Sequence, residues 1–483
     1  MLPVTAPLSN LLVQPARNET VRLRGIRCFK RAQYARLGRI TVLVGENSTG
    51  KSTFLAVCSL LPYLLQPESI NFNRSPFVLG SYRNIATTRS KGTDNADSFE
   101  IGFDSDITLP YSPSLTTDSA KDSDMKRLLG IVHGKEESKH CSIITRFSEQ
   151  NGQPHSVISL IRIGSYKFEV DWSRSSGNKI KTLSHGTDVV HFDDFEEFPQ
   201  MAHFGFPFES DGLNWNYTIE EIIKRSFLGQ ISESFQSNNL KIVRSYFSQL
   251  LTEIRSQTAY ALAPIRSTPK RTYDPVQTRI EPSGSHVPMV LSKLSRENTE
   301  AWKSLREILG YFGKTSGLYG SISVRNLGIS PSDPFQLEVG VDGNNRVNLL
   351  DVGYGVSQIL PIIVDSVTLG WPRRFLFQQP EIHLHPQGHV ALATFLVDRI
   401  AKTTQDFVIE SHSDHLIDQL RIEIGDRKLD PTVVSLLYFE NDGGSVQIHE
   451  IEIDRLGNLK NVPNSYRRFF LNHQYALLGM KGE

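Results

Sequence analysis

The sequence of 483 residues has few cysteines and no net charge. Its three cysteines, Cys28, Cys58 and Cys141, lack the spacing of a disulfide framework or a metal site. Such a sparse, odd set is typical of a reducing compartment, so we expect a cytoplasmic protein. The 52 Lys and Arg residues balance 52 Asp and Glu residues. This balance excludes a globally basic nucleic-acid-binding protein, although it leaves a local basic groove open.

Long hydrophobic runs are also missing. A membrane-spanning helix needs about 18 or more apolar residues, and no stretch approaches that length. The longest apolar run, residues 54–65, is interrupted by Ser59 and Pro62. The first residues, MLPVTAPLSNLL, lack the basic and apolar regions of a signal peptide. We therefore expect no membrane association, and a composition with 39% apolar and 22% charged residues is that of a globular protein.

A glycine-rich segment lies between a predicted buried strand, residues 40–44 (ITVLV), and a helix predicted over residues 51–65. Its sequence, GENSTGKS at 45–52, fits the P-loop pattern G-x-x-x-x-G-K-[ST] in the required context. Backbone N–H groups of such a loop and the following helix N-terminus bind phosphate oxygens. Lys51 would reach the β- and γ-phosphates of ATP, and the Ser52 hydroxyl would bind Mg²⁺. The predicted nucleotide-binding residues here are Gly45, Glu46, Asn47, Ser48, Thr49, Gly50, Lys51, Ser52 and Thr53.

Three further motifs occur in the C-terminal part of the chain. The first, DVGYGVSQ at 351–358, places two glycines before a predicted helix, whose N-terminus is an anion site. The others, FLFQQPEIHLHP at 375–386 and DFVIESHSDH at 406–415, are short apolar strands that end in polar residues. A parallel sheet binds its ligand at such strand ends. The alternation of helices and short strands over 349–420 indicates that a parallel sheet is present.

In this order, the four motifs resemble those of ABC-type ATPases of the RecF, SMC and OLD kind, and more narrowly of the stand-alone AAA-15/AAA-21 group. The resemblance covers residues 1–100 and roughly 255–470. It implies an α/β fold, a P-loop NTPase head with a mixed sheet flanked by helices, which closes as a dimer over two ATP molecules. His412 matches the switch histidine of these ATPases. The residues that would cap ATP bound to a partner copy are Gly353, Gly355, Ser357 and Gln358.

One departure from the family concerns the acids that normally end the Walker B strand. This chain has Gln378 at the Mg²⁺-linked position and Gln379 at the position of the general base. An amide accepts a hydrogen bond from metal-bound water, but it cannot act as a base. Glu381 and Glu410 are the nearest acids, and three interpretations stay open. One of these acids takes the missing role, or hydrolysis is slow and the protein works mainly by binding ATP, or the glutamines are engineered replacements of glutamate. The candidate catalytic residues are Gln379, Glu381, Glu410 and His412, and the candidate metal-binding residues are Ser52 and Gln378.

We expect three regions in the chain. They are an N-terminal lobe of the head with the P-loop (1–103), an inserted α+β region (104–255) and a C-terminal lobe with the remaining motifs (256–483). The inserted region is too short and too rich in strand patterns for an SMC-type coiled coil, and the C-terminal part shows no nuclease motif. The resemblance thus implies an ATPase that assembles with itself and regulates a separate effector, such as a nuclease. Similar ATPases occur in two-component anti-phage systems such as Septu, retron-associated Septu and PARIS.

Two alternatives come from other classes of protein, a RecF-like ATP-gated DNA-repair factor and a non-hydrolysing nucleotide-dependent scaffold. Residues 255–279 suggest contact with DNA, because basic residues are in excess there. This segment has one acid, Asp274, and two tyrosines, Tyr260 and Tyr273. The basic residues are Arg255, Arg266, Lys270, Arg271 and Arg279. The segment fits three interpretations equally: a track for a phosphate backbone, a solvated face, or a contact of Arg266 and Arg271 with nucleotide.

Overall fold

The computed structural model describes residues 18–64, 66–88, 96–108, 138–164, 166–172, 179–185, 188–191, 249–250, 252–275, 279–297, 300–341 and 345–466. A seven-stranded mixed sheet organises them, in the order β10-β14-β15-β3-β16-β17-β18. Five of its strands are parallel: β10 (Ala259–Leu262), β14 (Arg374–Gln378), β15 (Asp406–Glu410), β3 (Ile40–Gly45) and β16 (Val434–Asp442). β17 (Ser445–Ile453) and β18 (Leu459–Lys460) continue it in antiparallel fashion. The predicted parallel sheet is confirmed.

An eight-stranded antiparallel sheet packs beside the mixed sheet. It contains β2 (Gln33–Leu37), β1 (Glu19–Arg24), β4 (Phe99–Thr108), β5 (Ser138–Gln150), β6 (Gln153–Ile163), β7 (Tyr166–Asp171), β8 (Lys179–His185) and β9 (Asp188–His191), in this order. β5 and β6 form a hairpin that turns at Asn151 and Gly152, whose φ angles of 54° and 75° suit this residue pair. The boundary predicted at 103/104 falls within β4, so strands of the inserted region extend the sheet that β1 begins. The helical part expected of this α+β region lies largely outside the described residues.

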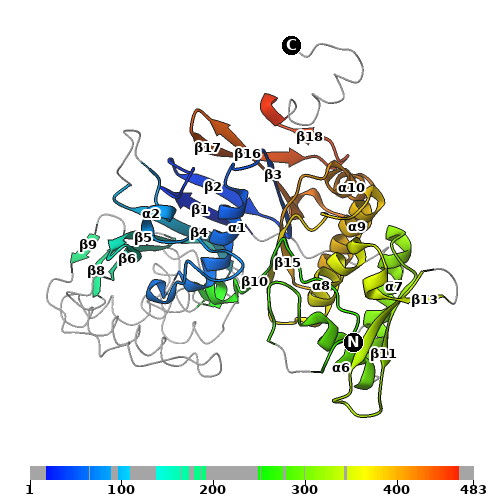
Figure 1. Cartoon of the computed structure of the whole chain (residues 1–483). Coiled ribbons are helices and arrows are strands. Elements are labelled where there is room, and N and C mark those ends of the chain that lie inside the picture. The colour runs from blue at the N-terminus through cyan, green and yellow to red at the C-terminus, as the bar shows by residue number, and fades with distance from the viewer. Residues whose placement is uncertain are drawn as a thin grey trace, which may run out of the picture.

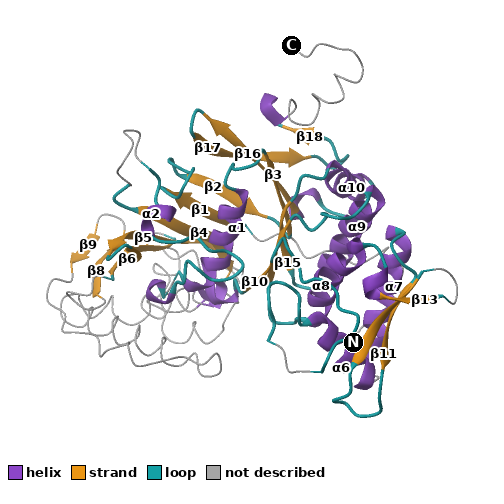
Figure 2. Cartoon of the chain, in the orientation of Figure 1, coloured by secondary structure: helices purple, strands orange, loops and turns teal. Residues whose placement is uncertain are grey.

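Helices cover both faces of the mixed sheet, as Figures 1 and 2 show. α1 (Lys51–Leu60) and the antiparallel sheet lie on one face, and α8 (Tyr354–Thr368), α9 (Pro386–Lys402) and α10 (Asp414–Gly425) lie on the other. α1 ends five residues before the predicted end, and Pro62 follows within a short 3₁₀ turn, Leu61–Tyr63, because proline cannot continue the ladder of N–H bonds. No helix in the described ranges is long and apolar enough to cross a bilayer.

The two faces have separate hydrophobic cores, because successive side chains of a strand point to opposite sides. In β3, Leu43 belongs to the core shared with α1 and the antiparallel sheet, whereas Val42 and Val44 belong to the core under α8–α10. The second core also contains α6 (Val287–Glu297) and α7 (Glu300–Ser316). A three-stranded sheet, β11 (Ser321–Asn326), β12 (Phe335–Gly340) and β13 (Arg346–Asn348), packs against α7. The predicted mixed sheet flanked by helices is thereby confirmed.

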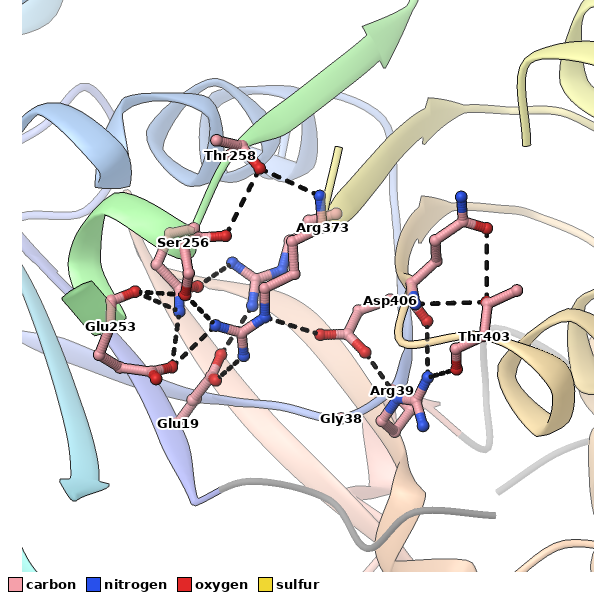
Figure 3. Close-up of polar contacts among 12 residues, drawn as sticks. Glu19, Gly38, Arg39, Glu253, Ser256, Thr258, Arg373, Thr403 and Asp406 are labelled. Atoms are coloured by element: carbon pink, nitrogen blue, oxygen red, sulfur yellow. Dashed lines mark hydrogen bonds and ion pairs between the residues drawn. The ribbon is translucent and has the colours of Figure 1, made fainter. Parts of the chain in front are cut away.

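A cluster of charged side chains, which we call the basal charge cluster, joins the amino ends of the parallel strands to the antiparallel sheet (Figure 3). Its members are Arg39, Arg373 and Arg374, which are positive, and Glu19, Glu253 and Asp406, which are negative. Arg39 Nε lies 2.7 Å from Asp406 Oδ1, and Arg373 contacts Glu19, Glu253 and Asp406. Arg374, with a side chain 0% exposed, donates to Glu19 Oε2 at 2.7 Å. The three arginines and the three carboxylates therefore give this largely buried cluster no net charge.

Removing one acid of this cluster should destabilise the protein strongly. We predict that Glu19→Ala lowers the free energy of unfolding by about 3–5 kcal/mol, because the buried guanidinium of Arg374 loses its charge partner. Urea denaturation followed by circular dichroism measures the change. Glu300→Ala is the matched control, since its exposed pair with Lys303 should contribute nothing measurable. An unchanged unfolding midpoint in Glu19→Ala would show that the basal charge cluster does not join the two sheets.

Candidate functional site

The P-loop lies between β3 and α1, as predicted. Gly50 has φ 87°, and a Cβ there would lie 2.6 Å from both Cys28 Sγ and Phe29 Cζ, so a glycine is required. No side chain caps the first turn of α1, and that turn contains no acid. Its N–H groups therefore face the loop with the positive end of the helix dipole, which is an arrangement that binds phosphate.

Lys51 is the buried cation of this loop. Its Nζ donates to Gly45 O at 2.9 Å and to Glu46 O at 2.6 Å, with 3% of the residue exposed. Burial lowers the pKa of Lys51, and the charges of Glu410 and Glu46 oppose that shift. Thr49 Oγ1 also donates to Glu46 O, at 2.8 Å, and thereby closes the turn. The side chains of Glu46, Asn47 and Ser48 are exposed around it.

The carboxyl ends of β3, β15 and β14 bring three of the predicted motifs together. β15 lies between the other two, and Glu410 pairs with Leu43 on one side and Gln378 on the other. Ser52 Oγ donates to Glu410 Oε2 at 2.8 Å. Gln379, whose φ is 44°, donates its backbone N–H to Glu410 O at 2.8 Å. Ser52, Gln378 and Glu410 therefore offer hydroxyl, amide and carboxylate oxygens at one strand edge.

This donor set fits Mg²⁺, which takes oxygen ligands and relies on substrate phosphates and water for most of its shell. The described residues contain no group of three His, Cys, Asp or Glu side chains that could hold a metal by themselves. When bound, Mg²⁺ would neutralise charge on the phosphates, and Ser52 with the neighbouring carboxylate would hold it. The sequence motif assigns the Mg²⁺-linked position to Gln378, which is paired directly with Glu410 on the adjacent strand.

Glu381 orients residues 411–413, which carry His412, the predicted switch histidine, and which we call the switch loop. Its Oε1 accepts from Ser411 Oγ at 2.8 Å and from the backbone N–H of His412 at 2.9 Å. Glu381 is 6% exposed, so these contacts are shielded from water. Ser413, one residue beyond His412, accepts from Leu416 N and caps α10. The position of His412 is thus fixed from both sides.

Arg266 is a buried cation beside this loop. It is 2% exposed, and none of its three guanidinium nitrogens has a hydrogen-bond partner among the described residues. Burial lowers its pKa to about 10, while the charges of Glu381 and Tyr354 oppose the shift. Glu381 Oε2 is likewise buried without a hydrogen bond. Arg266 therefore lies within the electrostatic reach of both the switch loop and the start of α8.

The signature-like motif forms the start of α8. Gly353 precedes the helix without a side-chain cap, Ser357 Oγ donates to Tyr354 O at 2.7 Å, and Gln358 Nε2 lies 3.4 Å from Ser357 Oγ. A Cβ on Gly355 would lie 2.5 Å from His383 O, so the motif packs closely on the loop that follows β14. Tyr354 is 40% exposed. Gly353 and Tyr354 are thus exposed at this uncapped helix end, whereas Gly355, Ser357 and Gln358 are buried behind them.

A pocket of about 340 Å³ adjoins this helix, between the segment 267–274 and the side chains of Ser357, Leu360 and Pro361. Lys270 and Tyr273 line this pocket, but the segment does not form a continuous basic track. Arg271 pairs with Asp351 at 2.7 Å, and Tyr260 and Tyr273 are 6% and 7% exposed. Neither tyrosine can therefore stack on a base in this conformation. Arg255, Lys270 and Arg279 are exposed, as expected for a solvated face.

Sequence reasoning missed the turn behind the P-loop. Arg27 has φ 47°, and its Nη1 donates to Thr53 Oγ1 at 3.2 Å and its Nη2 to Leu79 O at 3.1 Å. Cys28 and Phe29 pack against Gly50. β1 ends at Arg24, and this turn follows it. No pattern in the sequence signals it, because the turn depends on contacts with α1 and the segment 79–84.

These features define a P-loop nucleotide-binding site in a mixed α/β fold. The family model AAA_15, described as AAA ATPase domain, matches residues 19–417, and the chain belongs to this family. The predicted fold class and ATPase family are thereby confirmed. No curated protein matches the sequence.

Solved SMC heads are distant structural neighbours. An SMC head bound to the C-winged helix domain of ScpA is 11% identical, with a TM-score of 0.40, over 91% of this chain and 99% of that chain. An Smc head with an extended coiled coil from Pyrococcus furiosus, bound to the C-terminal domain of ScpA, is 10% identical, with a TM-score of 0.40, over 91% and 97%. The SMC head domain from Thermotoga maritima is 11% identical, with a TM-score of 0.36, over 91% and 100%.

Stability should depend on pH through His412. Burial and then the charge of Lys51 lower the pKa of His412 below its ordinary 6.5. Below pH 6.5 the unfolded chain binds a proton that the folded chain resists, so stability falls as the pH falls through that window. We predict a smaller loss of thermal stability in His412→Gln than in the wild type between about pH 7.5 and 5.5. Differential scanning calorimetry measures it, and equal losses in both proteins would contradict a lowered pKa of the half-buried His412.

Proposed function

We propose that the protein binds ATP with Mg²⁺, assembles with a second copy through shared ATP sites, and regulates a separate effector protein. The observation that carries the proposal is the contact between the first turn of α1, with Lys51 and Ser52 at its uncapped N-terminus, and Glu410 at the end of β15. It provides a point charge, a metal-binding hydroxyl and backbone donors, which are the parts that hold a nucleoside triphosphate.

The start of α8 supports shared sites. Its uncapped N-terminus is a second place for phosphate, and within the chain it packs on the loop after β14. Exposed Leu350 and Tyr354, at 42% and 40%, flank it on the surface. A second copy that buried these side chains would bring its own phosphates to this helix. Gly353, Gly355, Ser357 and Gln358 would then cap ATP held by the partner.

Slow turnover fits the residues near the phosphates. Gln379 cannot act as a base, Glu381 accepts from Ser411 and His412, and Glu410 accepts from Ser52. Bound ATP would then act as a conformational signal that changes how well the assembly holds its effector. We propose a nuclease as the effector and anti-phage defence in the cytoplasm as the setting, by resemblance to two-component systems of this type. The buried Arg266, Tyr260 and Tyr273 favour this function over a RecF-like DNA clamp.

Shared sites predict complementation between two defective chains. Lys51→Ala removes the charge that binds the β- and γ-phosphates. Ser357→Arg puts a bulky cation at a buried position (7% exposed) in the first turn of α8 and so disrupts the helix end that would cap the partner's ATP. Each variant alone should fail to assemble on ATP, whereas a mixture should form dimers with one intact site. Multi-angle light scattering with and without ATP measures assembly. Failure of verified mixtures to assemble, while the wild type assembles, would argue against shared sites.

Regulation of a separate effector predicts that the chain alone does not cut nucleic acid. Incubation of the purified protein with DNA or RNA, ATP and Mg²⁺ should leave the substrates intact, as read on denaturing gels. A mock purification of the Lys51→Ala variant is the control for contaminating nucleases. Strand cleavage that co-purifies with the wild type and disappears in Lys51→Ala would overturn the regulator proposal and make the chain a nuclease.

A further inference from the structure

The carboxylate of Glu410 occupies a position that the family motif assigns to another strand. Glu410 ends β15, is 7% exposed, and accepts a hydrogen bond from Ser52 Oγ at 2.8 Å. Gln378 ends the neighbouring strand β14 directly opposite Glu410. β15 lies between β14 and the P-loop strand β3, so Glu410 is one strand closer to the P-loop than Gln378. The carboxylate of Glu410 therefore contacts the hydroxyl of Ser52, although Glu410 lies on β15 and not on β14, which carries the Walker B motif.

The chemistry of Mg²⁺ favours this acid over the amide. Protein sites hold Mg²⁺ through one or two carboxylates together with substrate phosphates. A carboxylate brings a negative charge that compensates the cation, and it accepts hydrogen bonds from metal-bound water. Gln378 offers a neutral carbonyl oxygen. Glu410 Oε2 accepts from Ser52 Oγ at 2.8 Å, and Ser52 follows Lys51 in the first turn of α1, so the carboxylate lies beside the phosphate-binding end of that helix.

The other acid near the site has a different task. Glu381 uses Oε1 to hold Ser411 Oγ and the N–H of His412, and its charge acts on the buried Arg266. It is therefore committed to the switch loop. Glu410, by contrast, contacts the hydroxyl predicted to bind the metal. We infer that Glu410 is the metal-linked carboxylate of this ATP site and replaces Gln378 in that role from the adjacent strand.

This inference deepens the proposed function and rests on it. If Glu410 holds the metal, it is not available as the general base, and Gln379 has no basic group. Metal-assisted ATP binding and ATP hydrolysis are then separated in this chain. The metal contribution to binding should depend on Glu410, whereas removal of Gln378 should affect it much less.

The test compares ATP affinity in Mg²⁺ and in EDTA by isothermal titration calorimetry. In the wild type, Mg²⁺ should tighten ATP binding, and Glu410→Gln should reduce this enhancement about 10- to 100-fold. Gln378→Ala should reduce it far less. Gln378→Asp combined with Glu410→Gln should recover part of it, since the swap returns a carboxylate to the neighbouring strand. Glu452→Gln is the matched control, because Glu452 is exposed on β17.

Several outcomes separate this inference from the proposed function. Full Mg²⁺ enhancement in Glu410→Gln, or its loss in Gln378→Ala, would overturn the role of Glu410 and leave ATP binding intact. Wild-type protein that does not bind ATP, or Lys51→Ala that binds it equally well, would overturn the proposed function itself. If Glu410→Gln does not fold, Glu410→Asp decides: it keeps the charge but shortens its reach, so the enhancement should fall, and an unchanged enhancement would overturn the inference.

Discussion

Six charged side chains at the amino ends of the parallel strands hold the two sheets of this protein in a fixed relation. Burying a single guanidinium such as Arg374 would be very costly, but Glu19 on the antiparallel sheet compensates its charge. Asp406 accepts from Arg39 at the entry to β3 and lies near Arg373 at the entry to β14. Burial raises the pKa of Asp406, and these arginines oppose that shift. These ion pairs therefore hold the amino ends of β3, β14 and β15, whose carboxyl ends form the ATP site.

A second, smaller set of buried polar groups lies beyond the carboxyl ends of the same strands. Glu381 accepts a hydrogen bond from the backbone N–H of His412, and its charge opposes the effect of burial on the pKa of Arg266. Neither Arg266 nor Glu381 Oε2 is hydrogen-bonded among the described residues, and unpaired buried groups are costly. Arg266 and Glu381 are therefore two buried groups of opposite charge, with incomplete hydrogen bonding, beside the loop that carries His412.

The sequence could predict the parts of the site that depend on local pattern. The P-loop between β3 and α1, the strands β14 and β15, and the helix α8 all follow from short motifs and apolar runs. The contact between Ser52 and Glu410 could not be predicted, because it depends on β15 lying between β3 and β14. Likewise, nothing local reveals that Arg266 is buried or that Arg271 pairs with Asp351. The sequence also does not indicate that strands of the inserted region extend the sheet of the N-terminal lobe, because their pairing joins residues far apart in the chain.

That pairing gives the inserted strands a mechanical connection to the ATP site. β5–β7 continue the sheet of β1 and β4, and β1 carries Glu19. Glu253, on the segment where the chain returns from the inserted region, contacts Arg373 at 2.7 Å, the same residue that contacts Glu19. Arg373 immediately precedes β14, and β14 ends at Gln378 after only five residues. Contacts from the N-terminal strand β1 and from the returning segment therefore converge on Arg373, at the start of the strand that ends beside Glu410.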